Sequence, residues 1–217
     1  MENLKKKNSE NIKSRIKNFG EVFTSKNEIL EMLKMVENET YRLDSTYLET
    51  ACGDGNFLAS ILEKKFDIIK KDKDLNEYSI FKKVFISISS LYGIDLLPDN
   101  VHQTKIRLSD LSKKFLDNKL KEQYNKSFLK SLEFLLSLNI IAGDALSLKN
   151  LQNKPIVFSQ WSFLQGGLVK RSDYKFSNLI SYRPFEEGTL FSDMGEKVFI
   201  PDPVKDHKPV YFMDLEE

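Results

Sequence analysis

Apolar residues follow two spacings along the first 160 positions of the chain, and the two spacings alternate. Apolar residues recur every three or four positions, as in amphipathic helices, over 25–38, 57–62, 79–90, 98–111 and 124–137. Short, nearly continuous apolar runs, typical of buried strands, lie at 46–49, 91–96, 139–144 and 154–158. Strands that alternate with helices predict an α/β fold, with a mostly parallel sheet and helices on both faces.

Several boundaries of these elements carry local signals. Ser25 precedes the first expected helix and Glu28 follows three residues later, which is the spacing of a capping box. Residues 63–78 are rich in charge and are expected to form a helix end and a loop. Gly166 and Gly167 are expected to form the turn of a hairpin, because glycine readily adopts the positive φ angles of tight turns.

The chain is expected to divide into three parts. Residues 1–19 carry six basic and two acidic side chains and are expected to form a basic arm. Residues 20–160 hold the alternating strands and helices of the α/β domain. Residues 161–217 contain the hairpin and then an acidic, proline-containing stretch, and are interpreted as a loop-rich C-terminal segment.

Composition narrows the class of protein. The 217 residues include 33 basic and 32 acidic side chains, a balance that excludes a histone-like polycation. The single cysteine, Cys52, excludes an intrachain disulfide and a zinc site built from cysteines, and with only two histidines we expect no metal site. No apolar run approaches the length of a membrane span and no secretory signal opens the chain, so we expect a cytoplasmic protein without a membrane contact.

Polar residues or glycines follow three of the expected strands at their carboxyl ends, which meet at one edge of a parallel sheet. Gly53 and Gly55 follow the first strand and allow a ligand to approach the backbone closely. Asp95 ends the second strand, where a carboxylate can accept hydrogen bonds from ribose hydroxyls, and Asp144 ends the third, where it can meet the amine of an adenine ring. Each feature alone is also typical of ordinary loops and helix caps. Their order along three strands predicts a pocket for a cofactor that contains adenosine.

Two common phosphate-binding motifs are absent. Leu58 occupies the third glycine position of the dinucleotide fingerprint, and the chain contains no P-loop. The helix that follows Gly55 therefore lacks the usual cradle for a pyrophosphate. A cofactor with adenosine but without phosphate fits better, and S-adenosylmethionine is the obvious candidate.

Four segments, in this order, resemble motifs of the N6-adenine DNA methyltransferases of restriction–modification systems. They are Gly-Glu-Val-Phe-Thr at 20–24, Leu-Glu-Thr-Ala-Cys-Gly-Asp-Gly-Asn-Phe-Leu at 48–58, Tyr-Gly-Ile-Asp-Leu at 92–96, and Ile-Ala-Gly-Asp-Ala-Leu at 141–146. Thr50 stands where the family has a proline. The resemblance covers roughly residues 20–148. It implies a Rossmann-like, S-adenosylmethionine-dependent methyltransferase sheet.

The resemblance also implies which residues bind the cofactor: Phe23, Thr24, Glu49, Ala51, Cys52, Gly53, Asp54, Gly55, Asn56, Phe57, Asp95, Leu96, Asp144 and Ala145. The family's catalytic motif, a polar residue followed by two prolines and an aromatic residue, has no counterpart, because the chain contains no Pro-Pro pair. The residues after Trp161 are also too few for the family's later strands and DNA-recognition domain, so the sheet is expected to be truncated.

Gln160 and Trp161 occupy the place where the catalytic motif is expected. An amide can accept a hydrogen bond from the amine of a target adenine, and an aromatic ring can stack on a base that has left the helix. The alternative for Trp161 is ordinary packing in the core. Cys52 lies in the cofactor loop, where it is misplaced as the nucleophile that methylation of cytosine C5 requires.

Basic and aromatic residues interleave over 168–183 and form the candidate nucleic-acid contact: Lys170, Arg171, Tyr174, Lys175 and Arg183. The alternative for this segment is an exposed hairpin with an apolar inner face. Two functional hypotheses follow. The first is an S-adenosylmethionine-dependent DNA (adenine-N6) methyltransferase-like protein, a modification subunit or fragment, with DNA and a second subunit as partners. The alternative is an inactive S-adenosylmethionine-binding module that acts with a partner chain.

Overall fold

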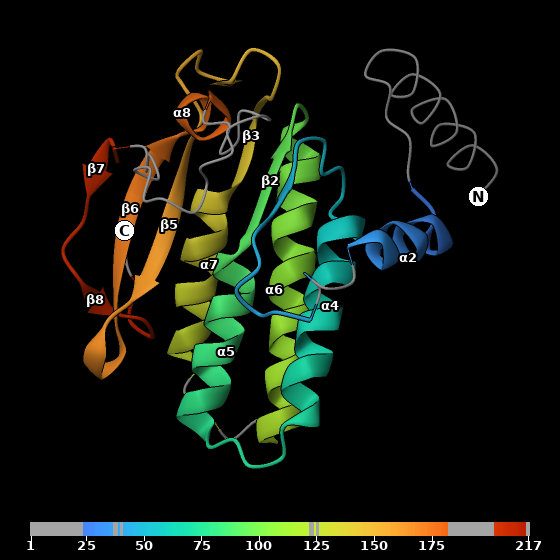
Figure 1. Cartoon of the computed structure of the whole chain (residues 1–217), viewed down its shortest axis with the longest axis vertical. Helices are drawn as coiled ribbons and strands as arrows, with labels where there is room; N and C mark the ends of the chain where they lie inside the picture. The colour runs from blue at the N-terminus through green and yellow to red at the C-terminus, as the bar shows by residue number, and fades with distance from the viewer. Residues whose placement is uncertain are drawn as a thin grey trace, which may run out of the picture.

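The computed structural model of the chain describes residues 24–36, 39, 41–121, 124, 126–181 and 202–215. Over these residues the chain is an α/β protein with two four-stranded sheets. Figure 1 shows the first sheet above and beside a group of long helices, and the second sheet along one side of that group. The predicted α/β class is confirmed.

The first sheet is mixed and has the strand order β1-β2-β3-β4. Its strands are β1 (Tyr47–Glu49), β2 (Leu91–Asp95), β3 (Ile140–Asp144) and β4 (Lys149–Asn150). β1, β2 and β3 are parallel, whereas the short β4, which the sequence pattern does not predict, is antiparallel to β3. Asp95 pairs with Ala142, so the carboxyl ends of β2 and β3 lie at the same edge of the sheet.

Four long helices connect the parallel strands: α4 (Asn56–Lys71), α5 (Glu77–Ser89), α6 (Pro98–Leu120) and α7 (Ser127–Asn139). α4 extends to Lys71, farther into the charged stretch than predicted. α2 (Lys26–Met35) packs against α4 and begins with the predicted capping box between Ser25 and Glu28.

The second sheet is antiparallel. Its strands are β5 (Val157–Phe163), β6 (Leu168–Lys175), β7 (Lys205–Asp206) and β8 (Val210–Tyr211), with the short helices η1 (Gln165–Gly167) between β5 and β6 and α8 (Phe176–Ser181) after β6. β5 and β6 form a hairpin, and both Gly166 and Gly167 in its turn have positive φ angles, which confirms the predicted turn. β7 and β8 both pair with β6.

The fourth strand expected at 154–158 is β5, which begins at Val157 and belongs to the second sheet and not to the parallel one. The hydroxyl of Tyr92 in β2 donates a hydrogen bond to the carbonyl oxygen of Ser159 at 3.1 Å. Two residues farther along β5, the ring of Trp161 contacts Phe85, which lies in the helix that precedes β2. β5 therefore runs opposite to β2 and pairs with β6. The domain boundary expected at residue 160 falls inside this strand.

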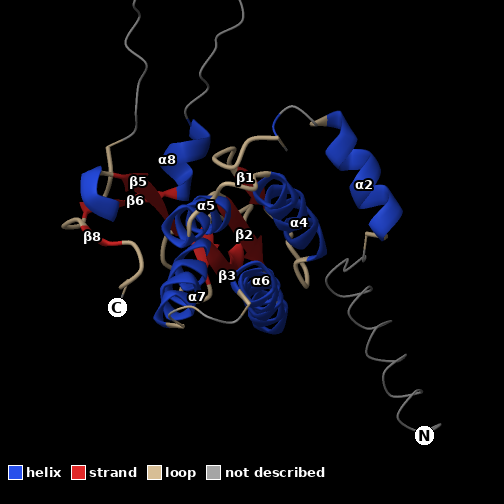
Figure 2. Ribbon diagram, turned by 90° about the horizontal axis from the view of Figure 1, so that it is seen from below, coloured by secondary structure: helices blue, strands red, loops and turns tan. Residues whose placement is uncertain are grey.

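The two faces of the first sheet have different covers. On one face a Cβ at Gly93 would meet Leu58 of α4 at 3.1 Å. On the other face Tyr92 and Ile94 pack in a cluster with Phe158 of β5 and Phe176 of α8. Figure 2 shows β1, β2 and β3 between α4 and α6 on one side and the second sheet on the other. The prediction of helices on both faces is therefore wrong for the second face, which is covered by β5 and the short α8 and not by long helices.

The end of the chain packs into the main core. Phe212 is fully buried and forms edge contacts with Phe85 of α5, Phe128 of α7 and Phe163 of β5 at 5.7, 5.9 and 5.5 Å between ring centroids. Leu215 is also buried, and its N–H donates to the hydroxyl of Ser131 at 2.9 Å. In the described C-terminal part, 202–215, only Lys205–Asp206 and Val210–Tyr211 are strands, and the remaining residues are loops and turns that pack on the domain.

A buried lysine links α4 to the amino-terminal ends of β1 and β2. Lys65 is fully buried, and its Nζ donates to the carbonyl oxygens of Leu43 and Ser45, each at 2.7 Å, and to the hydroxyl of Ser90. Three acceptors match the three protons of an ammonium group. Burial lowers the pKa of Lys65 to about 7, because desolvation disfavours the charged form.

A network of polar side chains connects β5, β6 and the residue after β7 in the second sheet. Asp173 of β6 accepts hydrogen bonds from Ser159 of β5 at 2.7 Å and from both sides of the Arg171 guanidinium, and its other oxygen lies 2.7 Å from His207, just after β7. Serine and histidine both bind the aspartate and not each other, so this is not a nucleophile activated by a base. Burial alone raises the pKa of Asp173, but the hydrogen bonds outweigh it and lower the pKa to about 2.

We expect this network to make stability depend on pH in acid. The pKa of Asp173 is lower in the folded chain than its ordinary value of 3.8, so the stabilisation is complete above about pH 4 and is lost as the pH falls toward 2. Its size is about 2 kcal/mol. Urea unfolding at pH 6 and pH 3 should show a smaller pH effect for Asp173→Asn than for the wild type. An equal effect in Asp173→Asn and in the surface control Asp110→Asn would contradict this assignment.

Candidate functional site

The candidate site is the edge where β1, β2 and β3 end. The turn between β1 and α4 places Gly53 and Gly55 in the left-handed region, with φ angles of 53° and 85°. These are conformations that side chains with a Cβ rarely adopt. A Cβ at Gly53 would meet no atom within 4 Å, so the backbone there faces open space. A Cβ at Gly55 would lie 2.9 Å from the side chain of Thr104, so this second glycine is required by packing.

Asp95 ties the glycine turn to the end of β2. Its Oδ2 accepts the Gly53 N–H at 2.9 Å, and its Oδ1 accepts the N–H of Leu97 at 2.9 Å and the side-chain amide of Asn100 at 3.1 Å. Asp95 thus binds the residue that precedes α6 and the side chain of Asn100, and it also holds the glycine turn. An ionised carboxylate offers about four acceptor positions, so Oδ2 retains capacity for a further donor such as a hydroxyl.

Side chains of α6 hold the glycine turn between β1 and α4 through hydrogen bonds. The hydroxyl of Thr104 donates to the carbonyl oxygen of Gly53 at 2.9 Å. The guanidinium of Arg107 binds Asp54 through both its backbone oxygen and its carboxylate, at 2.8 and 2.7 Å. None of these residues was among the predicted site residues except Asp54 and Gly53. Asn100, Thr104 and Arg107 recur at helical spacing after Asp95, and this polar stripe was the available signal.

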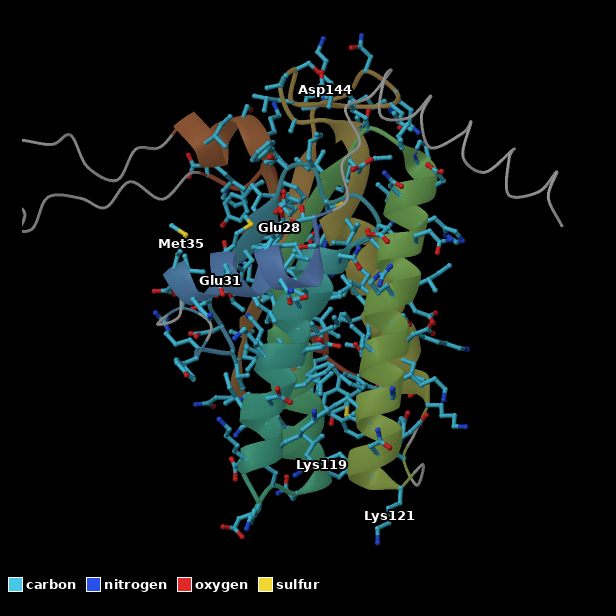
Figure 3. The ribbon with its side chains drawn as sticks, turned by 90° about the vertical axis from the view of Figure 1, so that its right-hand side faces the viewer. Glu28, Glu31, Met35, Lys119, Lys121 and Asp144 are labelled. Carbon is cyan, nitrogen blue, oxygen red and sulfur yellow. The ribbon has the colours of Figure 1, made fainter. Side chains whose placement is uncertain are left out.

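Asp144 lies at the end of β3, next to β2. Its carboxylate accepts the N–H of Leu146 at 2.9 Å, and this hydrogen bond lowers the pKa of Asp144 below its usual range. Figure 3 shows Asp144 at one end of the molecule, and Lys119 and Lys121, at the end of α6, at the other. Two large apolar side chains are exposed near this edge: Leu96 at 50% and Leu146 at 95%. They offer apolar surface that a planar ring could cover.

Glu49 ends β1 beside the glycine turn and is half-buried. Burial raises the pKa of Glu49, although a backbone hydrogen bond from Ala51 opposes this. Among the described residues no basic side chain forms an ion pair with Glu49. A half-buried carboxylate of this kind can accept a cationic group of a ligand.

Cys52 is buried behind the loop, where its Sγ lies 4.0 Å from the hydroxyl of Thr104. Burial raises the pKa of this thiol to about 12, so it is not a thiolate near neutral pH. This agrees with its exclusion as a nucleophile.

The remaining predicted cofactor residues lie partly at the same edge, partly before α2 and partly outside the described residues. Asn56 and Phe57 begin α4, Ala51 is exposed in the turn, and Ala145 follows Asp144. Thr24 is exposed just before α2. Phe23, like the expected arm at 1–19, lies outside the described residues.

Gln160 and Trp161 point to opposite sides of β5. Trp161 packs on the main core, edge-on to Phe85 at 5.8 Å, on the amino-terminal side of β2 and away from Asp95. This arrangement agrees with ordinary packing. Gln160 is exposed and lines a cavity together with Leu48 of β1.

The residues predicted to contact nucleic acid also differ in their surroundings. Lys170 forms an ion pair with Asp206 at 2.9 Å, and Arg171 is held by Asp173, so both charges are partly neutralised. Tyr174 lines the same cavity as Gln160, and Lys175 is exposed. Arg183 lies outside the described residues.

Among the described residues, β1 is the last strand on one side of the first sheet. β1 pairs with β2 on one side and with no described strand on the other. In doubly wound sheets the ligand lies between the first strand and a neighbour on that other side. The described edge comprises the carboxyl ends of β1, β2 and β3.

Comparisons with models of protein families, with curated proteins and with solved structures gave no match. Among the described helices, none is both long enough and apolar enough to cross a membrane. The described residues also hold no group of three or more histidine, cysteine or acidic side chains arranged to bind a metal ion.

The two glycines of the turn should respond differently to alanine. In Gly53→Ala the new methyl group enters open space, so the fold is retained at a cost of about 1 kcal/mol for the left-handed backbone, while a ligand is kept from the loop. In Gly55→Ala the methyl group meets Thr104, so unfolding should become easier by about 2 kcal/mol or more. Thermal unfolding and ligand binding, measured on both variants, separate the two effects. Equal loss of stability in both variants would contradict the expectation that packing requires a glycine at position 55 but not at position 53.

Proposed function

We propose that the chain binds S-adenosylmethionine at the carboxyl edge of β1, β2 and β3, as the cofactor-binding half of an adenine-N6 DNA methyltransferase of the restriction–modification type. The observation that carries the proposal is the link between Gly53 and Asp95 at 2.9 Å, with open space in front of the glycine. A strand-end carboxylate, a glycine turn and a second strand-end carboxylate are then neighbours, as a Rossmann-like methyltransferase requires.

The residues present fit such a cofactor. Asp95 Oδ2 accepts a ribose hydroxyl, and Leu96 and Leu146, which are exposed, cover the faces of an adenine ring. Glu49, half-buried and without a described cationic partner, pairs with the ammonium group of the methionine end. No basic cradle is needed, because the cofactor carries no phosphate. When bound, it supplies a methyl group activated by a sulfonium, and transfer then depends chiefly on alignment with the acceptor nitrogen.

A second candidate function is a cofactor-binding module that acts with a partner chain and does not itself transfer the methyl group. Two observations favour it: one edge of β1 pairs with no described strand, and β5 runs opposite to β2, which removes Gln160 and Trp161 from the place of the missing catalytic motif. A partner chain would lie beside this edge of β1.

The test is in two steps on the full chain. Calorimetry first measures S-adenosylmethionine binding, and methyl-labelled cofactor is then incubated with unmethylated DNA of mixed sequence. Binding followed by label in adenine supports the methyltransferase. Binding without label supports the module. Absence of binding at millimolar cofactor overturns both.

A further inference from the structure

The face of α6 that meets the glycine turn is polar, although most of it is buried. Asn100, Thr104 and Arg107 follow one another at intervals of four and three residues, which places them on one face of the helix. Asn100 is 6% exposed and Thr104 is 0% exposed. Because buried polar groups cost free energy unless they are hydrogen-bonded, packing alone does not explain such a face.

Two of these side chains hold backbone carbonyl groups of the turn. The hydroxyl of Thr104 donates to the carbonyl oxygen of Gly53 at 2.9 Å. Arg107 donates through Nε to the carbonyl oxygen of Asp54 at 2.8 Å and through Nη2 to its carboxylate at 2.7 Å. A planar guanidinium that binds the backbone and the side chain of one residue fixes the orientation of that residue. The peptide groups on both sides of Asp54 are therefore attached to α6.

The attached residues lie where the chain itself restricts the backbone least. Gly53 and Gly55 have positive φ angles, but glycine populates several other regions about as readily. The turn therefore has alternative conformations, and in the observed one the face of Gly53 is open. A protein that populates its binding conformation only in part binds its ligand more weakly by that fraction. Contacts that select one conformation of the turn thus raise the affinity for a ligand.

The contact between Arg107 and Asp54 contributes little to the stability of the whole chain. Their side chains are 39% and 26% exposed, and ion pairs with this exposure add little to the free energy of unfolding. Among the described residues, Arg107 is also the only side chain that donates to the carboxylate of Asp54. The contact is therefore better suited to orienting the turn than to stabilising the fold.

We propose that Thr104 and Arg107 are positioning residues, which hold the glycine turn in its ligand-binding conformation. Thr104 is fully buried and acts through the carbonyl group of Gly53 alone. Arg107 acts through Asp54, whose carboxylate serves as its attachment to α6. The choice of S-adenosylmethionine as the ligand rests on the proposed function, whereas the conformational role of the two side chains does not.

Two conservative substitutions of Thr104 separate positioning from packing. Thr104→Val keeps the branched shape but lacks the hydroxyl, whereas Thr104→Ser keeps the hydroxyl but lacks the methyl group beside Gly55. In calorimetry on the full chain, S-adenosylmethionine binding should weaken about tenfold in Thr104→Val and less than about threefold in Thr104→Ser. A larger loss in Thr104→Ser than in Thr104→Val would show that packing is what matters and would overturn the role of Thr104.

The role of Arg107 is tested together with its partner. Arg107→Ala should weaken binding about tenfold, and adding Asp54→Ala should cause no further loss, because the carboxylate acts only through the guanidinium. Lys113→Ala breaks an ion pair with Asp117 farther along α6 and should leave binding unchanged. Additive losses in the double variant, or an equal loss in Lys113→Ala, would contradict this role.

Hydrogen exchange of the turn, measured without ligand, separates this proposal from the proposed function. The N–H groups of Gly53 and Gly55 are both hydrogen-bonded and should exchange slowly in the wild type. Their exchange should become several-fold faster in Arg107→Ala and Thr104→Val, while the melting temperature of Arg107→Ala stays close to that of Lys113→Ala. Exchange at the wild-type rate in both variants refutes the proposal. If exchange becomes faster but the wild type does not bind S-adenosylmethionine, the positioning role stands and the proposed function fails.

Discussion

Asp95→Ala is expected to weaken S-adenosylmethionine binding by about 1.5–3 kcal/mol, which is roughly 10- to 150-fold in dissociation constant. The reason is twofold. The variant loses the carboxylate that would accept a ribose hydroxyl, and it also frees the Gly53 N–H, the Leu97 N–H and the Asn100 amide that the carboxylate holds. The glycine turn therefore loses its attachment to β2.

Calorimetric titration of the wild type, Asp95→Ala, Asp95→Asn and Asp110→Ala checks this expectation. Asp95→Asn keeps one acceptor oxygen and should lie between the wild type and alanine. Asp110 is exposed farther along α6 and serves as the matched acidic control, with unchanged affinity. Undiminished affinity in Asp95→Ala would show that the pocket is wrongly assigned. A loss of the same size in Asp110→Ala would point to a general charge effect.

Phe212→Ala is expected to lower the free energy of unfolding by about 3–5 kcal/mol. The ring is fully buried and touches rings of α5, α7 and β5, so its removal leaves a cavity where three elements meet. This loss is a large share of the stability of an ordinary domain.

Urea unfolding followed by circular dichroism measures this effect. Val210→Ala is the matched control, because Val210 lies two residues earlier in β8 and is 42% exposed, so it should cost less than 1 kcal/mol. A similar small cost for both variants would mean that the C-terminal strands contribute little to the fold.

The strands and the glycine turn were accessible to sequence reasoning because their signals are local. Ser25 and Glu28 form the capping box that their spacing predicts, and the turns at Gly53, Gly55, Gly166 and Gly167 all have positive φ angles. The three strand ends also meet at one edge, since parallel strands separated by helices place their carboxyl ends together.

Other features depend on residues far apart in the chain, and these the sequence pattern does not predict. Lys65 belongs to a charged stretch that suggests exposure, yet acceptors 20 to 25 positions away allow its burial. The run at 154–158 has the composition of a parallel strand. Its direction is decided by β6, which pairs with β5 along its whole length.

The alternation of strands and helices, and the set of chemical groups at the edge of β1, β2 and β3, follow from local sequence alone. Periodicity and turn chemistry are properties of neighbouring residues, and they persist in any packing. Long-range packing is what brings Asp95 to Gly53, sets β5 opposite to β2 and places Phe212 in the core. These contacts join residues far apart in the sequence, such as Leu215 and Ser131, which lie 84 positions apart. Local patterns do not specify such contacts, because they are selected by close packing among all elements.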